Sequence, residues 1–104
     1  MSDEIAREVD FFSVGTNDLC QYTLAADRQN THVAPLVQSQ REPVLRLIEH
    51  AASVIHQAEG WIGICGEMAA DLHLTQRFAD MGIDELSVSV PYLLGLREKV
   101  TECK

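Results

Sequence analysis

Residues 10–18 read Asp10-Phe11-Phe12-Ser13-Val14-Gly15-Thr16-Asn17-Asp18, an apolar run that ends at a glycine and is followed by three polar residues. Short runs of this kind, rich in aromatic and β-branched side chains and closed by a turn residue, are typical of a buried strand. The pattern returns at Trp61-Ile62-Gly63-Ile64-Cys65, which breaks at Gly66. We predict a third strand from Glu85 to Val88. Three strands are therefore expected, separated by longer segments.

The longer segments carry helical patterns. We expect helices over 43–58, 72–81 and from Ser89 through Val100, the end of a helix over 3–8, and a short helix or loop over 19–27. Pro43 suits a first helical turn, and the apolar residues after it recur at three- and four-residue spacing. Gly60 and Gly82 are expected to end their helices by adopting positive φ. Asp71 and Ser89 can cap the helices that follow them.

The alternation of strand and helix predicts the fold class. Strands that alternate with helices form parallel sheets with crossover helices, so we expect an α/β protein built from three βα units. Strands that are apolar almost throughout fit a sheet covered on both faces. Because a closed (β/α)₈ barrel takes about 250 residues, the chain can supply at most three of its eight units. The pattern alone leaves a barrel fragment and a small free-standing layer equally open.

Composition bounds the class of protein. The 104 residues suffice for one small domain; they are 46% hydrophobic and carry a formal charge of −8. That charge argues against nucleic acid and anionic membranes as partners, because both need clustered cations. We find no membrane-length apolar run and no apolar secretory signal near Met1. Three cysteines without zinc-like pairing favour a reducing, cytoplasmic setting.

Polar residues follow the first two predicted strands, and ligands of parallel α/β proteins bind at that edge of the sheet. Asp18 could hold Mg²⁺, which prefers oxygen ligands, and Asn17 could donate to a phosphate. The alternative is that Asn17 and Asp18 simply form a turn. Cys65, followed by Gly66 and Glu67, is placed for acid–base work, since an isolated thiol titrates near about pH 8.5 and holds a proton at neutral pH. The alternative for Cys65 is a buried apolar filler.

The remaining cysteines and the histidines have no such setting. Cys20 and Cys103 are expected to be inert. The four histidines show no ligand spacing, and His50 and His56 are six positions apart, so they do not share a helix face. We therefore expect no histidine metal site.

Two blocks together closely resemble one family. Residues 10–30, which continue as Leu19-Cys20-Gln21-Tyr22-Thr23-Leu24-Ala25-Ala26-Asp27-Arg28-Gln29-Asn30, and residues 63–71, Gly63-Ile64-Cys65-Gly66-Glu67-Met68-Ala69-Ala70-Asp71, resemble enzyme I of the bacterial sugar phosphotransferase system. Pyruvate phosphate dikinase and phosphoenolpyruvate synthase share parts of both blocks and remain alternatives. The resemblance implies that residues 1–104 are the C-terminal part of a phosphoenolpyruvate-binding (β/α)₈ barrel, incomplete on its own. The segment 37–43 departs from the family pattern.

The resemblance also implies roles for single residues. Asp18 would bind Mg²⁺, while Asn17 and Arg28 would contact the phosphoryl group. Cys65 would protonate the enolate as pyruvate forms. Glu67 would support these residues without contacting the substrate itself. Mg²⁺ and a guanidinium would offset charge on the phosphoryl group during its transfer.

The same resemblance implies partners that this chain does not itself contain. The family transfers the phosphoryl group of phosphoenolpyruvate to a histidine on another domain and passes it to the phosphocarrier protein HPr. Nothing in these 104 residues resembles that histidine domain. We therefore expect the isolated chain to be inactive, or to act as a module that self-associates or pairs with full-length enzyme I. Three strands of a barrel have two open edges, and their inner face would be bare without the opposite strands. Both features predict a homo-oligomer.

Overall fold

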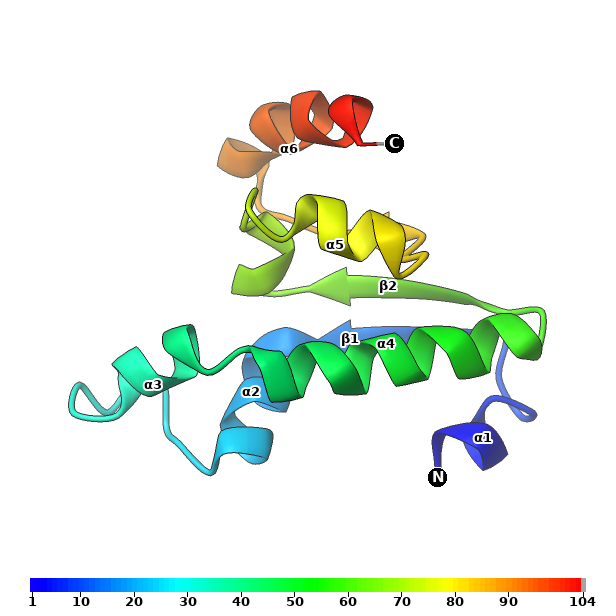
Figure 1. The fold of residues 1–104 in the computed structure, drawn as a ribbon, viewed down its shortest axis with the longest axis horizontal. Coiled ribbons are helices and arrows are strands. Elements are labelled where there is room, and N and C mark those ends of the chain that lie inside the picture. Colours follow the sequence, from blue (N-terminus) through cyan, green and yellow to red (C-terminus); the bar gives the residue numbers. More distant parts are fainter. Residues whose placement is uncertain (104) are drawn as a thin grey trace.

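The computed structural model describes residues 1–103 and contains one sheet of three parallel strands in the order β1-β2-β3 (Figure 1). The strands are β1 (Phe11–Gly15), β2 (Trp61–Cys65) and β3 (Glu85–Leu86). The register aligns Gly15 with Cys65, so the first two strands end side by side. The predicted α/β class, with parallel strands in three βα units, is confirmed.

Six α-helices accompany the sheet within these residues: α1 (Ser2–Ile5), α2 (Thr16–Leu24), α3 (Ala34–Ser39), α4 (Glu42–Gln57), α5 (Thr75–Asp80) and α6 (Val90–Glu102). A 3₁₀ helix, η1 (Glu67–Ala70), follows β2. In Figure 1, α4 runs along β1, and α5 lies between β2 and α6. None of the helices in the described part of the chain is long and apolar enough to cross a membrane.

The core lies where α4 packs on the sheet. Six side chains of α4 are buried, because its apolar residues recur on one face of the helix. Ile48 packs with Ile64 and Phe78 in one cluster, and Ile55 packs with Ile62 in a second. The helix α4 therefore connects both clusters and fixes β1 and β2 beneath it.

The opposite face of the sheet is largely uncovered, as expected for the inner face of three strands that resemble part of a barrel. Phe11, Ser13 and Gly15 alternate along β1 and are exposed. The ring of Phe11 stacks on that of Trp61, with 4.6 Å between the ring centroids, and both side chains remain exposed. Within residues 1–103 both rings stay open to solvent on this face, whereas both apolar core clusters include residues of α4.

Several predicted ends of elements were wrong. The helix expected over 72–81 begins at Thr75, because residues 72–74 form a turn. In this turn the Asp71 carboxylate accepts a hydrogen bond from the His73 amide instead of capping α5. β3 ends at Leu86 rather than Val88. After α4, the residue with positive φ is Glu59, at 62°, and not the glycine that follows it.

Candidate functional site

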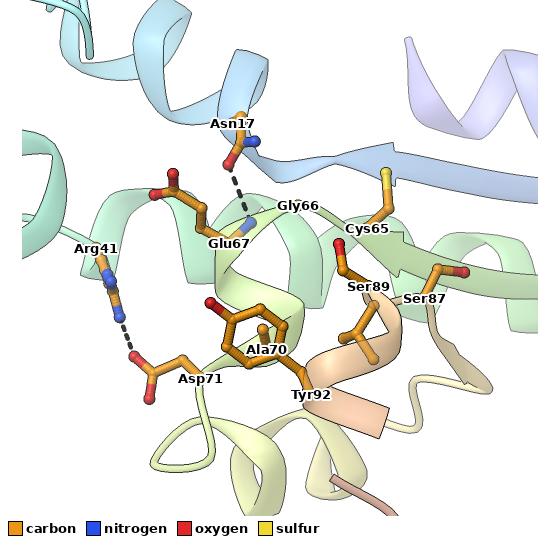
Figure 2. A pocket seen from close by; sticks show the side chains of 11 residues that line it. Asn17, Arg41, Cys65, Gly66, Glu67, Ala70, Asp71, Ser87, Ser89 and Tyr92 are labelled. Carbon is orange, nitrogen blue, oxygen red and sulfur yellow. Dashed lines mark hydrogen bonds and ion pairs between the residues drawn. The ribbon is translucent and has the colours of Figure 1, made fainter. Parts of the chain in front are cut away.

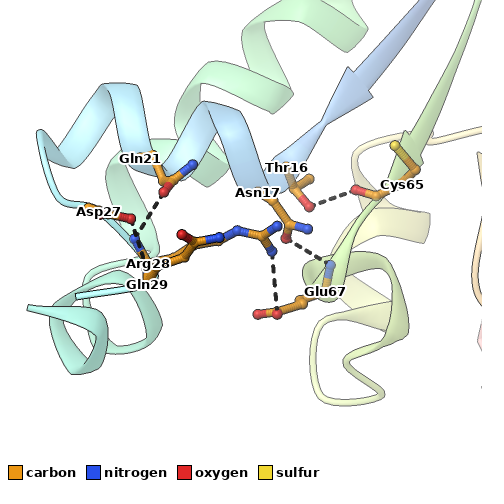
Figure 3. Close-up of polar contacts among 8 residues, drawn as sticks. All are labelled: Thr16, Asn17, Gln21, Asp27, Arg28, Gln29, Cys65 and Glu67. Carbon is orange, nitrogen blue, oxygen red and sulfur yellow. Dashed lines mark hydrogen bonds and ion pairs between the residues drawn. The ribbon is translucent and has the colours of Figure 1, made fainter. Parts of the chain in front are cut away.

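The carboxyl ends of β1 and β2 are tied together by side chains at the start of α2. Thr16 is buried, and its hydroxyl donates a hydrogen bond of 2.6 Å to the carbonyl oxygen of Cys65. The Asn17 Oδ1 atom accepts a hydrogen bond of 3.1 Å from the Glu67 amide (Figure 3). These two bonds connect segments that lie about fifty positions apart in the sequence. Asn17 and Asp18 belong to the first turn of a helix, so their interpretation as a plain turn was wrong.

Gly66 makes this junction possible. Its φ is +95°, a conformation that side-chain-bearing residues rarely adopt. A Cβ atom at this position would lie 2.6 Å from Thr16 Oγ1 and 3.0 Å from Asn17 Oδ1. Only a glycine therefore lets the backbone after Cys65 approach the start of α2 this closely.

The thiol of Cys65 is exposed, which rules out its interpretation as a buried filler. Cys20 is the cysteine that fills the core: it is 4% exposed, and its Sγ atom lies 3.5 Å from Met68 Sδ. Burial raises the pKa of the Cys20 thiol. The two cysteines therefore differ in solvent access, and Cys65 is the one that a dissolved molecule can reach.

An open pocket of about 580 Å³ lies beside these strand ends, between η1 and the start of α6 (Figure 2). It is lined by Asn17, Arg41, Cys65, Gly66, Glu67, Ala70, Asp71, Ser87, Val88, Ser89 and Tyr92. Three of the predicted site residues, Asn17, Cys65 and Glu67, thus share one pocket. Polar groups that converge on a concave surface are the usual mark of a ligand site.

Arg28 joins this group from the loop after α2. Its Nη1 atom lies 3.6 Å from Glu67 Oε1, and its backbone amide donates a hydrogen bond of 2.9 Å to Gln21 Oε1 (Figure 3). Arg28 lines a smaller cavity beside the pocket, which Asn17 and Glu67 also line. Asn17 therefore lies at the boundary between the 580 Å³ pocket and this smaller cavity.

Asp18 is the predicted site residue that the structure does not bring into the pocket. Its side chain is exposed in the first turn of α2, and it is not among the residues that line the 580 Å³ pocket. A carboxylate in the first turn is favourable for the helix itself, because the helix dipole is positive at that end.

Arg41 and Asp71 line the same pocket and were missed by sequence reasoning. Arg41 directly precedes α4, and its Nη1 atom pairs with Asp71 Oδ2 (Figure 2). Partial burial opposes ionisation of Asp71, but the hydrogen bonds from Arg41 and from the His73 amide bring the pKa of the carboxyl below its ordinary value. No spacing marks a pair thirty positions apart; the available signal was a basic residue within segment 37–43.

Comparison with known proteins identifies the family of the chain. A family described as "PEP-utilising enzyme, PEP-binding domain" matches residues 1–104. Enzymes named phosphoenolpyruvate-protein phosphotransferase are 47% identical over 100 residues in Geobacillus stearothermophilus, 46% over 102 residues in Bacillus sp. (strain S) and 43% over 102 residues in Bacillus subtilis (strain 168). The matches cover 96–98% of this chain but only 17–18% of those relatives' length. The chain therefore belongs to the family of PEP-utilising enzymes and matches its PEP-binding domain over the full length of this sequence.

Proposed function

We propose that this chain forms the C-terminal βα units of the phosphoenolpyruvate-binding (β/α)₈ barrel of a phosphoenolpyruvate-protein phosphotransferase. The complete enzyme would pass the phosphoryl group to a histidine on another domain and then to HPr, in cytoplasmic sugar transport. The observation that carries the proposal is the shared pocket of Asn17, Cys65 and Glu67 at the carboxyl ends of β1 and β2. The names of the relatives favour this assignment over a dikinase or synthase.

The exposed side chains of this site suit both phosphoryl transfer and protonation of the enolate. The cavity that Asn17 shares with Arg28 measures only about 20 Å³, so a phosphoryl group would lie in the larger pocket. The Asn17 amide and the Arg28 guanidinium, at the boundary of that pocket, can donate to its oxygens. Breaking the ester P–O bond leaves the enolate of pyruvate, while the phosphorus bonds to the acceptor histidine. The Sγ–H of Cys65 then gives its proton to the enolate carbon, and a thiolate remains. The solvent access of Cys65 allows this contact with a substrate in the neighbouring pocket.

Asp18 offers a ligand of the right chemistry for Mg²⁺. Its exposed carboxylate supplies hard oxygen donors, which this ion prefers. Among residues 1–103, no three or more His, Cys, Asp or Glu side chains are gathered in a metal-binding cluster. Asp18 would therefore hold the ion together with substrate phosphate oxygens and water, as is usual for Mg²⁺. The bound ion would offset charge on the phosphoryl group.

Nuclear magnetic resonance titration of the ¹⁵N-labelled chain tests the proposed site. Millimolar phosphoenolpyruvate with Mg²⁺ should shift the amides of Asn17, Arg28 and Cys65. Asp18→Asn should remove the dependence of these shifts on Mg²⁺, whereas Asp27→Asn, a matched exposed carboxylate in the next loop, should not. Unmoved amides at millimolar ligand would overturn the proposal.

Binding by this chain is expected without turnover, since it carries under a fifth of its relatives' length. Incubation with phosphoenolpyruvate labelled in its phosphoryl group should leave no label on the chain. A labelled residue here would contradict the prediction of inactivity.

A second candidate is a non-catalytic module that self-associates or pairs with full-length enzyme I. The exposed Phe11–Trp61 pair on the bare sheet face favours it, because uncovered apolar surface promotes association. The titration separates the two: a module needs no shift at Asn17 or Cys65. A pull-down of the full-length enzyme by the chain would support the module.

A further inference from the structure

A second arginine reaches the proposed site, and the functions assigned above do not use it. Arg41 lines the 580 Å³ pocket together with Cys65 and Asn17. It also lines the smaller cavity, where Arg28 and Asn17 lie. Its side chain is 26% exposed, so it is held against the protein while part of it remains accessible to a ligand.

The guanidinium of Arg41 has more N–H donors than its contact with Asp71 uses. The group presents five N–H donors in a planar fork that matches the two oxygens of a carboxylate. In residues 1–103, its contact with a side chain is through Nη1, which meets Asp71 Oδ2. The remaining nitrogens can therefore donate to an anion without breaking the pair with Asp71.

Asp71 holds this guanidinium in place. The Asp71 Oδ1 atom accepts a hydrogen bond of 3.0 Å from the His73 amide, which fixes the carboxylate relative to the loop after η1. The Arg41–Asp71 pair is also less exposed than the Arg28–Glu67 pair, whose side chains are 41% and 70% exposed. Ion pairs that are less exposed to water are screened less, so Arg41 is the better-oriented cation of the two.

The two arginines lie in different parts of the site. Arg28 lines the small cavity with Asn17 but not the pocket that holds the Cys65 thiol, whereas Arg41 lines both. In phosphoenolpyruvate, the carboxylate and the carbon that receives a proton are both attached to the central carbon, and the phosphoryl group lies beyond the ester oxygen. A substrate with its phosphoryl group at Asn17 and Arg28 and its reacting carbon at Cys65 would carry its carboxylate toward Arg41.

We infer that Arg41 binds the carboxylate of the substrate and thereby orients it between the phosphoryl-binding residues and Cys65. The inference rests on the proposed function and adds to it a residue from the segment 37–43, where this sequence departs from the family pattern. Arg41 places a guanidinium at the pocket of a chain whose formal charge is −8, where a multiply charged anion needs cationic partners.

The test compares Arg41→Gln with Arg46→Gln. Both changes remove one arginine, but Arg46 lies on the exposed side of α4, where it pairs with Glu42 at 3.4 Å. Dissociation constants for phosphoenolpyruvate, pyruvate and inorganic phosphate are measured by ¹⁵N titration. Arg41→Gln should weaken binding of phosphoenolpyruvate and pyruvate about tenfold and change phosphate binding less than about twofold. Arg46→Gln should leave all three unchanged.

Every other outcome would contradict either the role of Arg41 or the proposed function. Unchanged pyruvate and phosphoenolpyruvate affinities in Arg41→Gln, with binding intact in the unmodified chain, overturn the role of Arg41 and leave the proposed function standing. Equal weakening of phosphate assigns Arg41 to the phosphoryl group instead and overturns the inference. An unmodified chain that binds none of the three overturns both. Should Arg41→Gln fail to fold, Arg41→Lys keeps the charge but loses the planar fork, and its pyruvate affinity should fall about threefold or more.

Discussion

At the scale of single residues, Gly66 determines whether the chain after β2 can approach the start of α2. The backbone turns there with a φ of +95°, and the space that a side chain would occupy is taken by Thr16 and Asn17. Gly15, at the end of the neighbouring strand, has a φ of −78° and no heavy atom within 4 Å of a built Cβ. Two glycines at adjacent strand ends therefore have opposite tolerance for a methyl group.

We predict that Gly66→Ala lowers the free energy of unfolding by about 2–4 kcal/mol, because it combines an unfavourable φ with a contact to Thr16 Oγ1 that is too short. Gly15→Ala should change the free energy of unfolding by less than about 1 kcal/mol. Urea denaturation monitored by circular dichroism measures both. Equal effects of the two substitutions would mean that the junction at Gly66 is not closely packed.

The sequence was informative about residues next to strand ends and uninformative about contacts made across the fold. Asn17, Glu67 and Cys65 could be placed at one edge because parallel strands end together. Arg41 could not, since its position depends on how the loop before α4 folds back toward η1. Asp71 looked like a helix cap because its pairing with a distant guanidinium leaves no trace in local sequence.

At the scale of elements, an ion pair joins the start of α4 to the middle of α5. Arg77 of α5 donates hydrogen bonds of 2.7 and 2.8 Å from its two terminal nitrogens to the carboxylate of Glu42, the first residue of α4. The hydrogen bond from Arg77 lowers the pKa of Glu42 to about 2, and Arg46 contributes less. The two-point geometry makes this the best-aligned surface pair between two helices in the described residues.

The pH dependence of this pair has a defined sign. The folded pKa of Glu42 lies near 2, below the ordinary value of 4.5, so the ionised form is favoured by folding. Its contribution to stability is present above about pH 4.5 and is lost as the pH falls toward 2. A ¹³C titration of the carboxyl groups should return a low pKa for Glu42. Arg77→Gln should raise that pKa more than Arg46→Gln; the reverse order would contradict the assigned geometry.

The ends of elements were predicted less well than the elements themselves. β2 was predicted with its exact bounds, and α4 lies within one residue of its predicted range at either end. Gly60 was expected to turn the chain after α4, yet Glu59 has the positive φ. A Cβ on Gly60 would lie 2.7 Å from the Asp10 carbonyl oxygen, so a close approach of two backbones explains this glycine. Such an approach is set by tertiary packing, which periodicity along the chain does not report.

At the scale of the whole molecule, burial is uneven. Both core clusters lie against α4, while β1 and β3 each pair on one side only within residues 1–103. The other face carries Phe11 and Trp61, which are 48% and 40% exposed. Open strand edges and uncovered aromatic rings both favour association.

We predict that the chain forms dimers or higher oligomers at micromolar concentration, as measured by sedimentation velocity. Trp61→Ser should weaken association because it removes half of the aromatic pair. Tyr22→Ser, which changes an aromatic side chain 87% exposed on α2, should not. A sharp monomer boundary at every concentration, together with cooperative thermal unfolding, would contradict this prediction.

The attachment of α6 has a consequence for access to the thiol. Leu96 is the one buried residue among the thirteen of α6, whereas α4 buries six of its sixteen. An element held by so little apolar surface opens at a lower free-energy cost than the elements around the core. Tyr92 and Ser89, which wall the pocket opposite Asn17, lie on α6 or immediately before it. Fraying of this helix therefore widens the entrance to Cys65 while the sheet beneath stays folded.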